Sequence, residues 1–281
     1  MSERMTAQKL KESKGGTPSV WLTAYDFPMA QAAQEAGVDV ILVGDSLGTT
    51  VMGYESTIPV TLDDMVYHAR MVRRGAPDTM MVVDLPFLTF TTADTALKSG
   101  GRVMQETLAD GVKLEGGRRV LDAVDALVGH DIPVIGHLGL TPQSVHAMGG
   151  YKVQARTHKA IQDLVDDARA LADHGIAALV LEGIPDRVAA YVTEVVPIPT
   201  IGIGAGNQTD GQVLVYHDCL GLSSRYPKFA KPFAELRQAT VAGINQFGSE
   251  VRSRAFPDDS HSYHITDKEW DAFWKEQESR P

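Results

Sequence analysis

Short runs of apolar and β-branched residues recur along the chain, separated by longer segments that mix apolar and charged residues at helical spacing. Eight such runs predict strands, at residues 20–23, 38–43, 80–83, 111–114, 133–136, 178–181, 200–204 and 212–216. The other segments predict helices at residues 29–36, 61–74, 93–109, 120–128, 158–174, 186–194 and 232–247. The pattern therefore predicts strands and helices in regular alternation.

Strands that are apolar on both faces and alternate with helices are typical of a parallel sheet covered on both sides. Eight such units in about 250 residues favour a closed (β/α)8 TIM barrel. A doubly wound open sheet also alternates in this way, but it gathers its ligand residues around one switch point. We expect one barrel domain at residues 1–255 and a C-terminal extension at residues 256–281, where a helix start is predicted at Thr266.

Acidic residues stand at the ends of four predicted strands: Asp45, Asp84, Glu115 and Glu182. In a TIM barrel the carboxyl ends of the strands meet at one face, so we expect these acids and His137 to face one pocket. A carboxylate at the mouth of an apolar strand is costly to desolvate, and carboxylates are the ligands that hard cations prefer. We therefore expect Asp45, Asp84 and Glu115 to bind Mg²⁺, directly or through water. Taken singly, each acid could instead be a solvated loop carboxylate or a helix cap, and Mn²⁺, Co²⁺ or Zn²⁺ could use the same ligands.

Other side chains near these acids are candidates for contacts with a substrate. Lys113 lies two residues before Glu115 on the same strand face, so it either binds a substrate carboxylate or enolate oxygen or pairs with one of the acids. Ser46 could offer its hydroxyl and backbone N–H to the same carboxylate. Glu182 follows an apolar run, which makes it the candidate proton acceptor. His137 is either a structural histidine or a substrate contact.

Glycines at residues 202, 204 and 206 follow the seventh predicted strand. They indicate either backbone that passes close to a ligand or a tight turn. The segment lacks the Lys-Ser/Thr ending of a P-loop and the strand–helix unit of a dinucleotide site, so neither is predicted.

Composition restricts the class of partner. The 281 residues are 43% hydrophobic and 22% charged, as in an ordinary soluble globular protein, and the net charge of -10 argues against a nucleic-acid or anionic-membrane surface. A single cysteine, Cys219, excludes an intramolecular disulfide and a thiolate metal cage. No run approaches the ~20 apolar residues of a membrane span, and residues 1–16 lack the apolar stretch typical of a secretory signal. We expect a cytoplasmic protein with a small-molecule partner.

Several segments are close to those of one enzyme family. They are TAYD (residues 23–26), VGDSLG (43–48), PVTLDDM (59–65), DLPF (84–87), VKLEGG (112–117), GHLGLTPQS (136–144), GGYKVQ (149–154), LEGIP (181–185) and IGIGAG (201–206). On these motifs the chain resembles the ketopantoate hydroxymethyltransferase (3-methyl-2-oxobutanoate hydroxymethyltransferase) family.

The resemblance implies a barrel of the phosphoenolpyruvate mutase/isocitrate lyase group. It implies transfer of a one-carbon unit from 5,10-methylenetetrahydrofolate to 3-methyl-2-oxobutanoate, giving 2-dehydropantoate in pantothenate and coenzyme A synthesis. It also implies a large homo-oligomer, often a decamer. Matched residue by residue, it assigns roles at six positions: Mg²⁺ binding to Asp45, Asp84 and Glu115, keto-acid contacts to Ser46 and Lys113, and proton acceptance to Glu182.

Two other functions fit part of the pattern. A metal-dependent lyase or mutase of the same superfamily, acting on a different 2-oxo acid, would keep the acids and change the pocket. A catalytically silent barrel would only bind a keto acid or serve as an assembly subunit. The silent barrel is disfavoured because buried acids without a cation destabilise a fold.

Overall fold

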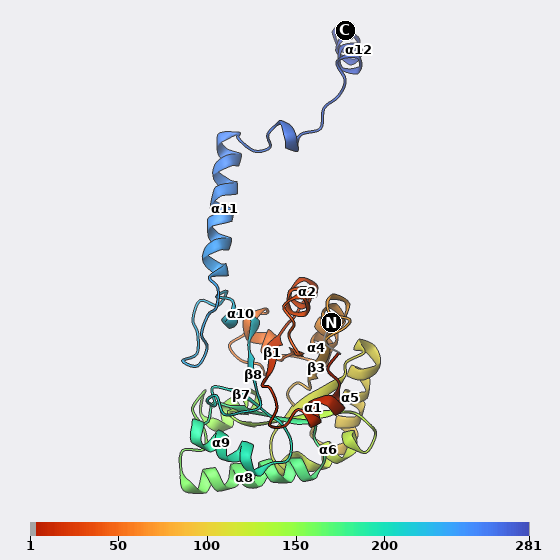
Figure 1. The fold of residues 1–281 in the computed structure, drawn as a ribbon. Coiled ribbons are helices and arrows are strands. Elements are labelled where there is room, and N and C mark those ends of the chain that lie inside the picture. The colour runs from red at the N-terminus through yellow and green to blue at the C-terminus, as the bar shows by residue number, and fades with distance from the viewer. Residues whose placement is uncertain (1–3, 281) are drawn as a thin grey trace. The chain divides into compact units, whose positions relative to one another are not determined.

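The computed structural model describes residues 4–280, and its strands form one closed parallel barrel in sequential order (Figure 1). The strands are β1 (Ser19–Thr23), β2 (Val40–Val43), β3 (Met80–Asp84), β4 (Gly111–Glu115), β5 (Val134–Gly139), β6 (Ala178–Glu182), β7 (Thr200–Ile203) and β8 (Gly211–Leu214). The barrel closes where β8 pairs with β1, with Val213 opposite Trp21. The predicted (β/α)8 barrel is confirmed, with a strand at each of the eight predicted places.

Helices of very different length connect and follow the strands. They are α1 (Ala7–Glu12), α2 (Phe27–Glu35), α3 (Leu47–Thr50), α4 (Leu62–Gly75), α5 (Ala93–Thr107), α6 (Leu121–Val128), α7 (Val145–Met148), α8 (His158–Asp173), α9 (Asp186–Val195), α10 (Tyr216–Cys219), α11 (Leu236–Ser253) and α12 (Asp267–Glu278), with 3-10 turns η1 (Arg118–Val120), η2 (Pro142–Ser144) and η3 (Asp259–His261). All seven predicted helices are present. The prediction lacks α1, α3, α7 and α10, because four to six residues carry too little periodicity. None of the helices in residues 4–280 combines the length and apolar character needed to cross a bilayer.

Threonine side chains determine where several of the long helices begin. The Thr61 hydroxyl accepts a hydrogen bond from Asp64 N, and the Asp64 carboxylate accepts one from Thr61 N. The Thr157 hydroxyl caps α8 in a similar way by accepting from Ala160 N. Such caps satisfy N–H groups that a first helical turn leaves without partners. They fix the ends of the loops that lead from the strands.

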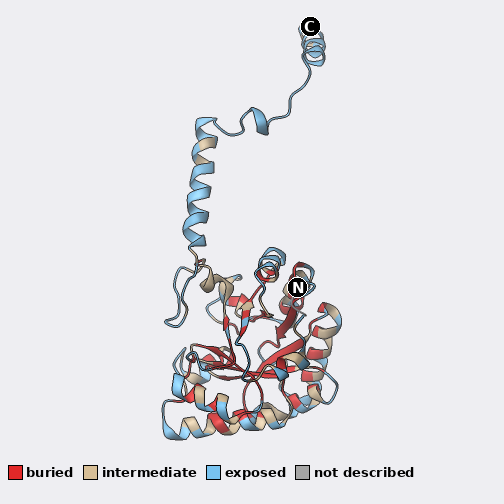
Figure 2. Ribbon diagram, viewed as in Figure 1, coloured by how far each residue is buried: buried red, intermediate tan, exposed pale blue. Residues whose placement is uncertain are grey.

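Alternation of side chains along the strands divides the apolar core into two layers. On β2, Ile41 and Val43 belong to the layer between strands and helices, whereas Val40 and Leu42 belong to the layer inside the barrel. The inner layer also contains the fully buried Leu10 of α1. Figure 2 shows the strands as the most continuously buried part of the chain. The barrel interior is therefore a packed core, and side chains can form an open site only beyond it.

Backbone contacts divide the chain into two compact units, Met1–Ala234 and Glu235–Pro281. The second unit contains α11 and α12, neither of which has a buried residue. Within α12, Trp270 stacks with Trp274 at 6.1 Å between ring centroids and tilts against Phe273 at 5.7 Å. The boundary between these units lies at residues 234/235, whereas the predicted domains are 1–255 and 256–281. Contact clusters alone do not test domain bounds, and the predicted bounds stay a prediction.

Asp210, which directly precedes β8, ties the segment before β1 to the start of β7. Its carboxylate accepts hydrogen bonds from Lys14 Nζ at 2.8 Å, Gly15 N at 2.9 Å and Thr200 N at 2.8 Å. Burial disfavours the charged carboxylate, but these donors outweigh it and lower the pKa of Asp210. The group therefore closes the amino end of the barrel with an ionised carboxylate.

We expect Asp210→Asn to lower the free energy of unfolding by about 2–4 kcal/mol at pH 7, because Lys14 and the backbone donors lose a charged partner. The depressed pKa makes this contribution present above the ordinary aspartate pKa of about 4 and lost as pH falls through the folded-state value. Urea unfolding at pH 7 and below pH 4 measures both effects. Lys159→Gln, which removes an exposed pair with Asp163, should leave the free energy of unfolding almost unchanged. An equal loss from both variants would contradict the assignment.

Candidate active site

A cavity of about 1340 Å³ lies at the carboxyl ends of the barrel strands. All the candidate site residues predicted from the sequence line it: Asp45, Ser46, Asp84, Lys113, Glu115, His137 and Glu182. The expectation that they face one pocket is confirmed. Their individual roles remain predictions.

The strand pattern explains why these polar side chains point inward. On β4, Val112 and Leu114 pack in the outer layer, so Lys113 and Glu115 point into the barrel. Strand register then sets which groups meet: Asp84 is opposite Lys113, and Glu115 is opposite His137. Neighbouring strands thus place an acidic side chain beside a basic one at the same level along the barrel.

Asp45 and Asp84 lie close together at the ends of β2 and β3. The Asp45 backbone N donates to Asp84 Oδ2 at 3.0 Å, and both side chains are buried. A Cβ added at Gly44 would lie 2.8 Å from Ser46 Oγ, so a larger residue there would displace the Ser46 hydroxyl. Burial, with the neighbouring charges of Asp84 and Glu115, raises the pKa of Asp45 well above its usual range. Two buried acids this close would be stabilised together by a cation.

Lys113 supplies one positive charge to this cluster. Its Nζ lies 3.1 Å from Asp84 Oδ1 and 3.3 Å from His137 Nδ1, and only 4% of its side chain is exposed. Burial opposes the ammonium, but Asp84, Glu115 and Asp45 outweigh it and raise the pKa of Lys113. The ion-pair alternative for Lys113 is therefore present in the structure. Lys113 also lines the cavity, so its ion pair with Asp84 does not exclude the predicted contact with a substrate.

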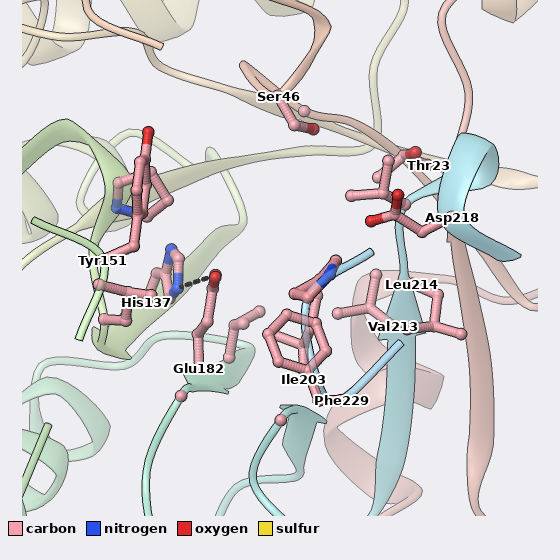
Figure 3. A pocket seen from close by; sticks show the side chains of 18 of the residues that line it. Thr23, Ser46, His137, Tyr151, Glu182, Ile203, Val213, Leu214, Asp218 and Phe229 are labelled. Atoms are coloured by element: carbon pink, nitrogen blue, oxygen red, sulfur yellow. Dashed lines mark ion pairs between the residues drawn. The ribbon is translucent and has the colours of Figure 1, made fainter. Parts of the chain in front are cut away.

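His137 joins Glu115 to Glu182. Its Nε2 lies 3.2 Å from Glu182 Oε2, the ion pair drawn in Figure 3, and its Nδ1 lies 3.4 Å from Glu115 Oε1. Burial and Lys113 lower the pKa of His137, but Glu115 and Glu182 outweigh them and raise it to about 9. Both ring nitrogens face protein groups, which supports a positioning role. Its predicted contact with substrate stays a prediction.

Two residues in contact with the cluster are absent from the sequence prediction. Gln143 Nε2 donates to Asp45 Oδ2 at 2.7 Å, and Gln143 N donates to Glu115 Oε2 at 3.0 Å. The Tyr25 hydroxyl lies 2.8 Å from Ser46 Oγ, and burial raises the pKa of Tyr25 to about 12, so it stays a neutral partner. Both lie inside motifs that carry the family resemblance, but a lone glutamine or tyrosine has no pattern that indicates a site.

Residues 4–280 contain no group of three or more His, Cys, Asp or Glu side chains arranged to hold a metal ion. Mg²⁺, however, commonly uses one or two carboxylates and fills its other positions with water and substrate oxygens. Asp84 Oδ1 and Glu115 Oε1 are buried and accept no aligned hydrogen bond, although Lys113 and His137 lie nearby. The donor set at Asp45 and Asp84 therefore fits a hard cation, with Glu115 reached through water. The predicted Mg²⁺ site stays a prediction.

Removing the Lys113 charge should destabilise the protein measured without divalent cations. We expect Lys113→Met to lower the free energy of unfolding by about 3–5 kcal/mol, because it leaves Asp84 buried without its cation. Adding Asp84→Asn should restore part of the loss. Urea unfolding of the two single variants and the double variant gives the coupling energy. Strictly additive losses would show that the contact is not an energetic pair.

Solved structures share this fold at low sequence identity. Phosphonopyruvate hydrolase superposes with a TM-score of 0.61 at 12% identity, covering 98% of this chain and 97% of that chain. A 2,3-dimethylmalate lyase described as a phosphoenolpyruvate mutase/isocitrate lyase superfamily member superposes with a TM-score of 0.60 at 19% identity, covering 92% of each chain. The structure is thus a (β/α)8 barrel of the kind found in that superfamily.

Sequence relationships then identify the family within this fold. The family model for ketopantoate hydroxymethyltransferase matches residues 4–259. The 3-methyl-2-oxobutanoate hydroxymethyltransferase of Carboxydothermus hydrogenoformans is 50% identical, over 93% of this chain and 96% of the relative. That of Bacillus pumilus is 47% identical over 98% of both. The chain is an enzyme of the ketopantoate hydroxymethyltransferase family.

Proposed function

We propose that the chain transfers a hydroxymethyl group from 5,10-methylenetetrahydrofolate to 3-methyl-2-oxobutanoate, giving 2-dehydropantoate for pantothenate synthesis. The names of the relatives support the activity and the oxo-acid substrate. One observation carries the proposal: Glu182 is paired with His137, and both line the cavity that Lys113, Asp45 and Asp84 also line.

The positive and hydroxyl groups of the cavity would orient the oxo acid. Lys113 and Ser46 both line the cavity near the acids, and they would bind the oxygens of the substrate carboxylate or its keto group. The Lys113 ammonium is buried and already held by Asp84, so it is positioned before substrate arrives. A preorganised cation in a buried site stabilises negative charge that develops on a substrate oxygen.

Glu182 would accept the proton from C3 of the oxo acid. Its side chain is 16% exposed and faces the cavity, so the carboxylate is accessible to a bound substrate. His137 would hold the Glu182 carboxylate in place through Nε2. The electron pair left by the C–H bond moves into the enolate, whose oxygen is stabilised by Lys113.

The remaining steps concern the one-carbon unit. The methylene carbon leaves both folate nitrogens, a water molecule supplies its oxygen, and C3 of the enolate forms the new C–C bond to it. Protons from Glu182 and water balance the nitrogens of the released tetrahydrofolate. The chain's own residues contribute binding, orientation and proton transfer.

Asp45 and Asp84, with Glu115 through water, would hold a Mg²⁺ ion. When bound, Mg²⁺ supplies Lewis-acid stabilisation to the oxygens of an oxo acid.

The family resemblance also implies a homo-oligomer, often a decamer. Exposed apolar side chains on α11, including Val241, Ile244 and Phe247, are suited to such contacts.

Glu182→Gln should abolish exchange of the C3 deuterium of labelled 3-methyl-2-oxobutanoate. A rate loss of at least about 100-fold is expected, because the amide cannot accept the proton. Proton NMR with Mg²⁺ present measures the exchange. Glu55→Gln, which also removes an acid from the cavity lining, should retain it. Normal exchange in Glu182→Gln would remove Glu182 as the base.

Product formation separates this function from that of a superfamily lyase. With methylenetetrahydrofolate added, the wild-type protein should form 2-dehydropantoate. Cleavage of other 2-oxo acids without folate-dependent product would instead support the lyase.

Gln143→Met should weaken divalent-ion binding about 10- to 100-fold, because Asp45 loses the side-chain donor that orients its carboxylate, while the backbone N–H to Glu115 is kept. Calorimetric titration with Mg²⁺ and electron paramagnetic resonance with Mn²⁺ measure binding without reference to activity. Gln162→Met, which removes a glutamine from the exposed face of α8, is the matched control and should bind normally. Wild-type affinity in Gln143→Met would argue against a metal at Asp45.

A further inference from the structure

The cavity is larger than a five-carbon oxo acid requires. Its volume of about 1340 Å³ exceeds the roughly 300–1,000 Å³ common for pockets that hold one drug-sized ligand. The acids, Lys113 and His137 come from β2 to β6 and the residues that follow them. The part of the lining contributed by β7, β8 and the segment after them has no role in the steps above.

This unused part of the lining is mostly apolar and contains an exposed aromatic ring. Ile203 on β7, Leu214 on β8 and Phe229 line it, and Figure 3 shows them across the cavity from His137. Phe229 is 38% exposed, and its ring lies over Gly204, where an added Cβ would be 2.6 Å from Phe229 Cδ1. Gly204 has φ +62 and also lines the cavity, so its backbone makes a turn and faces the cavity. The surface suits a flat ring that stacks on Phe229.

A carboxylate stands at the edge of this apolar wall. Asp218, on α10, lines the cavity, and Figure 3 shows its side chain beside Thr23 and Leu214. Ser223 Oγ donates to Asp218 Oδ1, while Oδ2 receives no hydrogen bond from any protein group in residues 4–280. Asp218 is half-buried, and no Lys, Arg or His of that described range forms an ion pair with it. A partly desolvated carboxylate of this kind suits a ligand edge with two adjacent N–H donors.

We propose that Ile203, Leu214 and Phe229 hold the pteridine ring of the folate donor and that Asp218 accepts hydrogen bonds from its 2-amino group and N3–H. The inference rests on the proposed function, which supplies a folate as the donor. The strand register supports the placement, because Ile203 is the residue opposite Glu182 in the β6–β7 pairing. A ring on Ile203 therefore lies next to the base that activates the oxo acid.

The rim of the cavity fits the other end of the same molecule. Lys152 and Lys228 are exposed, line the cavity and form no ion pair with an acid of residues 4–280. The protein carries a net charge of -10, so two unpaired lysines at one opening are a local exception. They suit the carboxylates of the glutamate tail.

Asp218→Asn tests the carboxylate contact with little change in shape. Calorimetric titration with tetrahydrofolate under anaerobic conditions should show binding about 10- to 100-fold weaker than in the wild type. Phe229→Leu should weaken the same binding several-fold through lost stacking. Deuterium exchange on the oxo acid should persist in both variants, which shows that the folded oxo-acid site is intact. Unchanged tetrahydrofolate binding in Asp218→Asn overturns the subsite.

A ligand change tests the same contact from the other side. A tetrahydrofolate analogue with methyl in place of the 2-amino group should bind the wild type more weakly than tetrahydrofolate does, whereas Asp218→Asn should barely distinguish the two. Equal discrimination by both proteins overturns the contact.

Asp186→Asn is the matched control, because Asp186 is another exposed acid of the cavity lining. Its tetrahydrofolate affinity should stay within about twofold of the wild type; a larger loss there than in Asp218→Asn would place the ring elsewhere. If the wild type binds no tetrahydrofolate, the folate part of the proposed function fails together with the subsite. Wild-type binding that Asp218→Asn retains removes the subsite alone.

Discussion

Compensation of buried charge is the constraint on which this site depends. Acids from the ends of β2, β3 and β4 lie out of water, where an isolated carboxylate is strongly disfavoured. Lys113 balances part of that charge through Asp84, and His137 balances part of it through Glu115 and Glu182. The raised pKa of Asp45 shows that the balance is incomplete at that position. An added cation would complete it, which is why the same cluster suits a metal and an anionic oxo acid.

The barrel makes such a cluster possible by separating apolar packing from chemistry along each strand. Val82 and Ile135 lie in the barrel interior, and Asp84 and His137 come two positions later on the same inward face. The outer layer meanwhile packs the strands against helices and keeps the register fixed. A slip of one residue in β4 would turn Lys113 and Glu115 toward the helices. Apolar packing therefore holds the charged groups in position.

The cavity has two chemically different sides. The side formed by β2 to β6 is charged and surrounds the candidate base, Glu182, whereas the β7–β8 side is mostly apolar and ends at Asp218. A reaction that joins a small anion to a carbon carried by a large flat donor needs both kinds of surface. The register of Glu182 with Ile203 places the border between the two sides at the candidate base.

Fold class and the main site residues could be predicted from the sequence alone, because buried parallel strands are continuous apolar runs and their carboxyl ends meet on one face. Asp84, Glu115 and Glu182 were identifiable for that reason. The tertiary structure decided which groups touch: Gln143 reaches Asp45, separated by 98 positions, through a loop with no local pattern. It also brought Asp218 and Phe229 to the cavity, because contacts between distant segments depend on how the barrel closes, and no local periodicity records that closure.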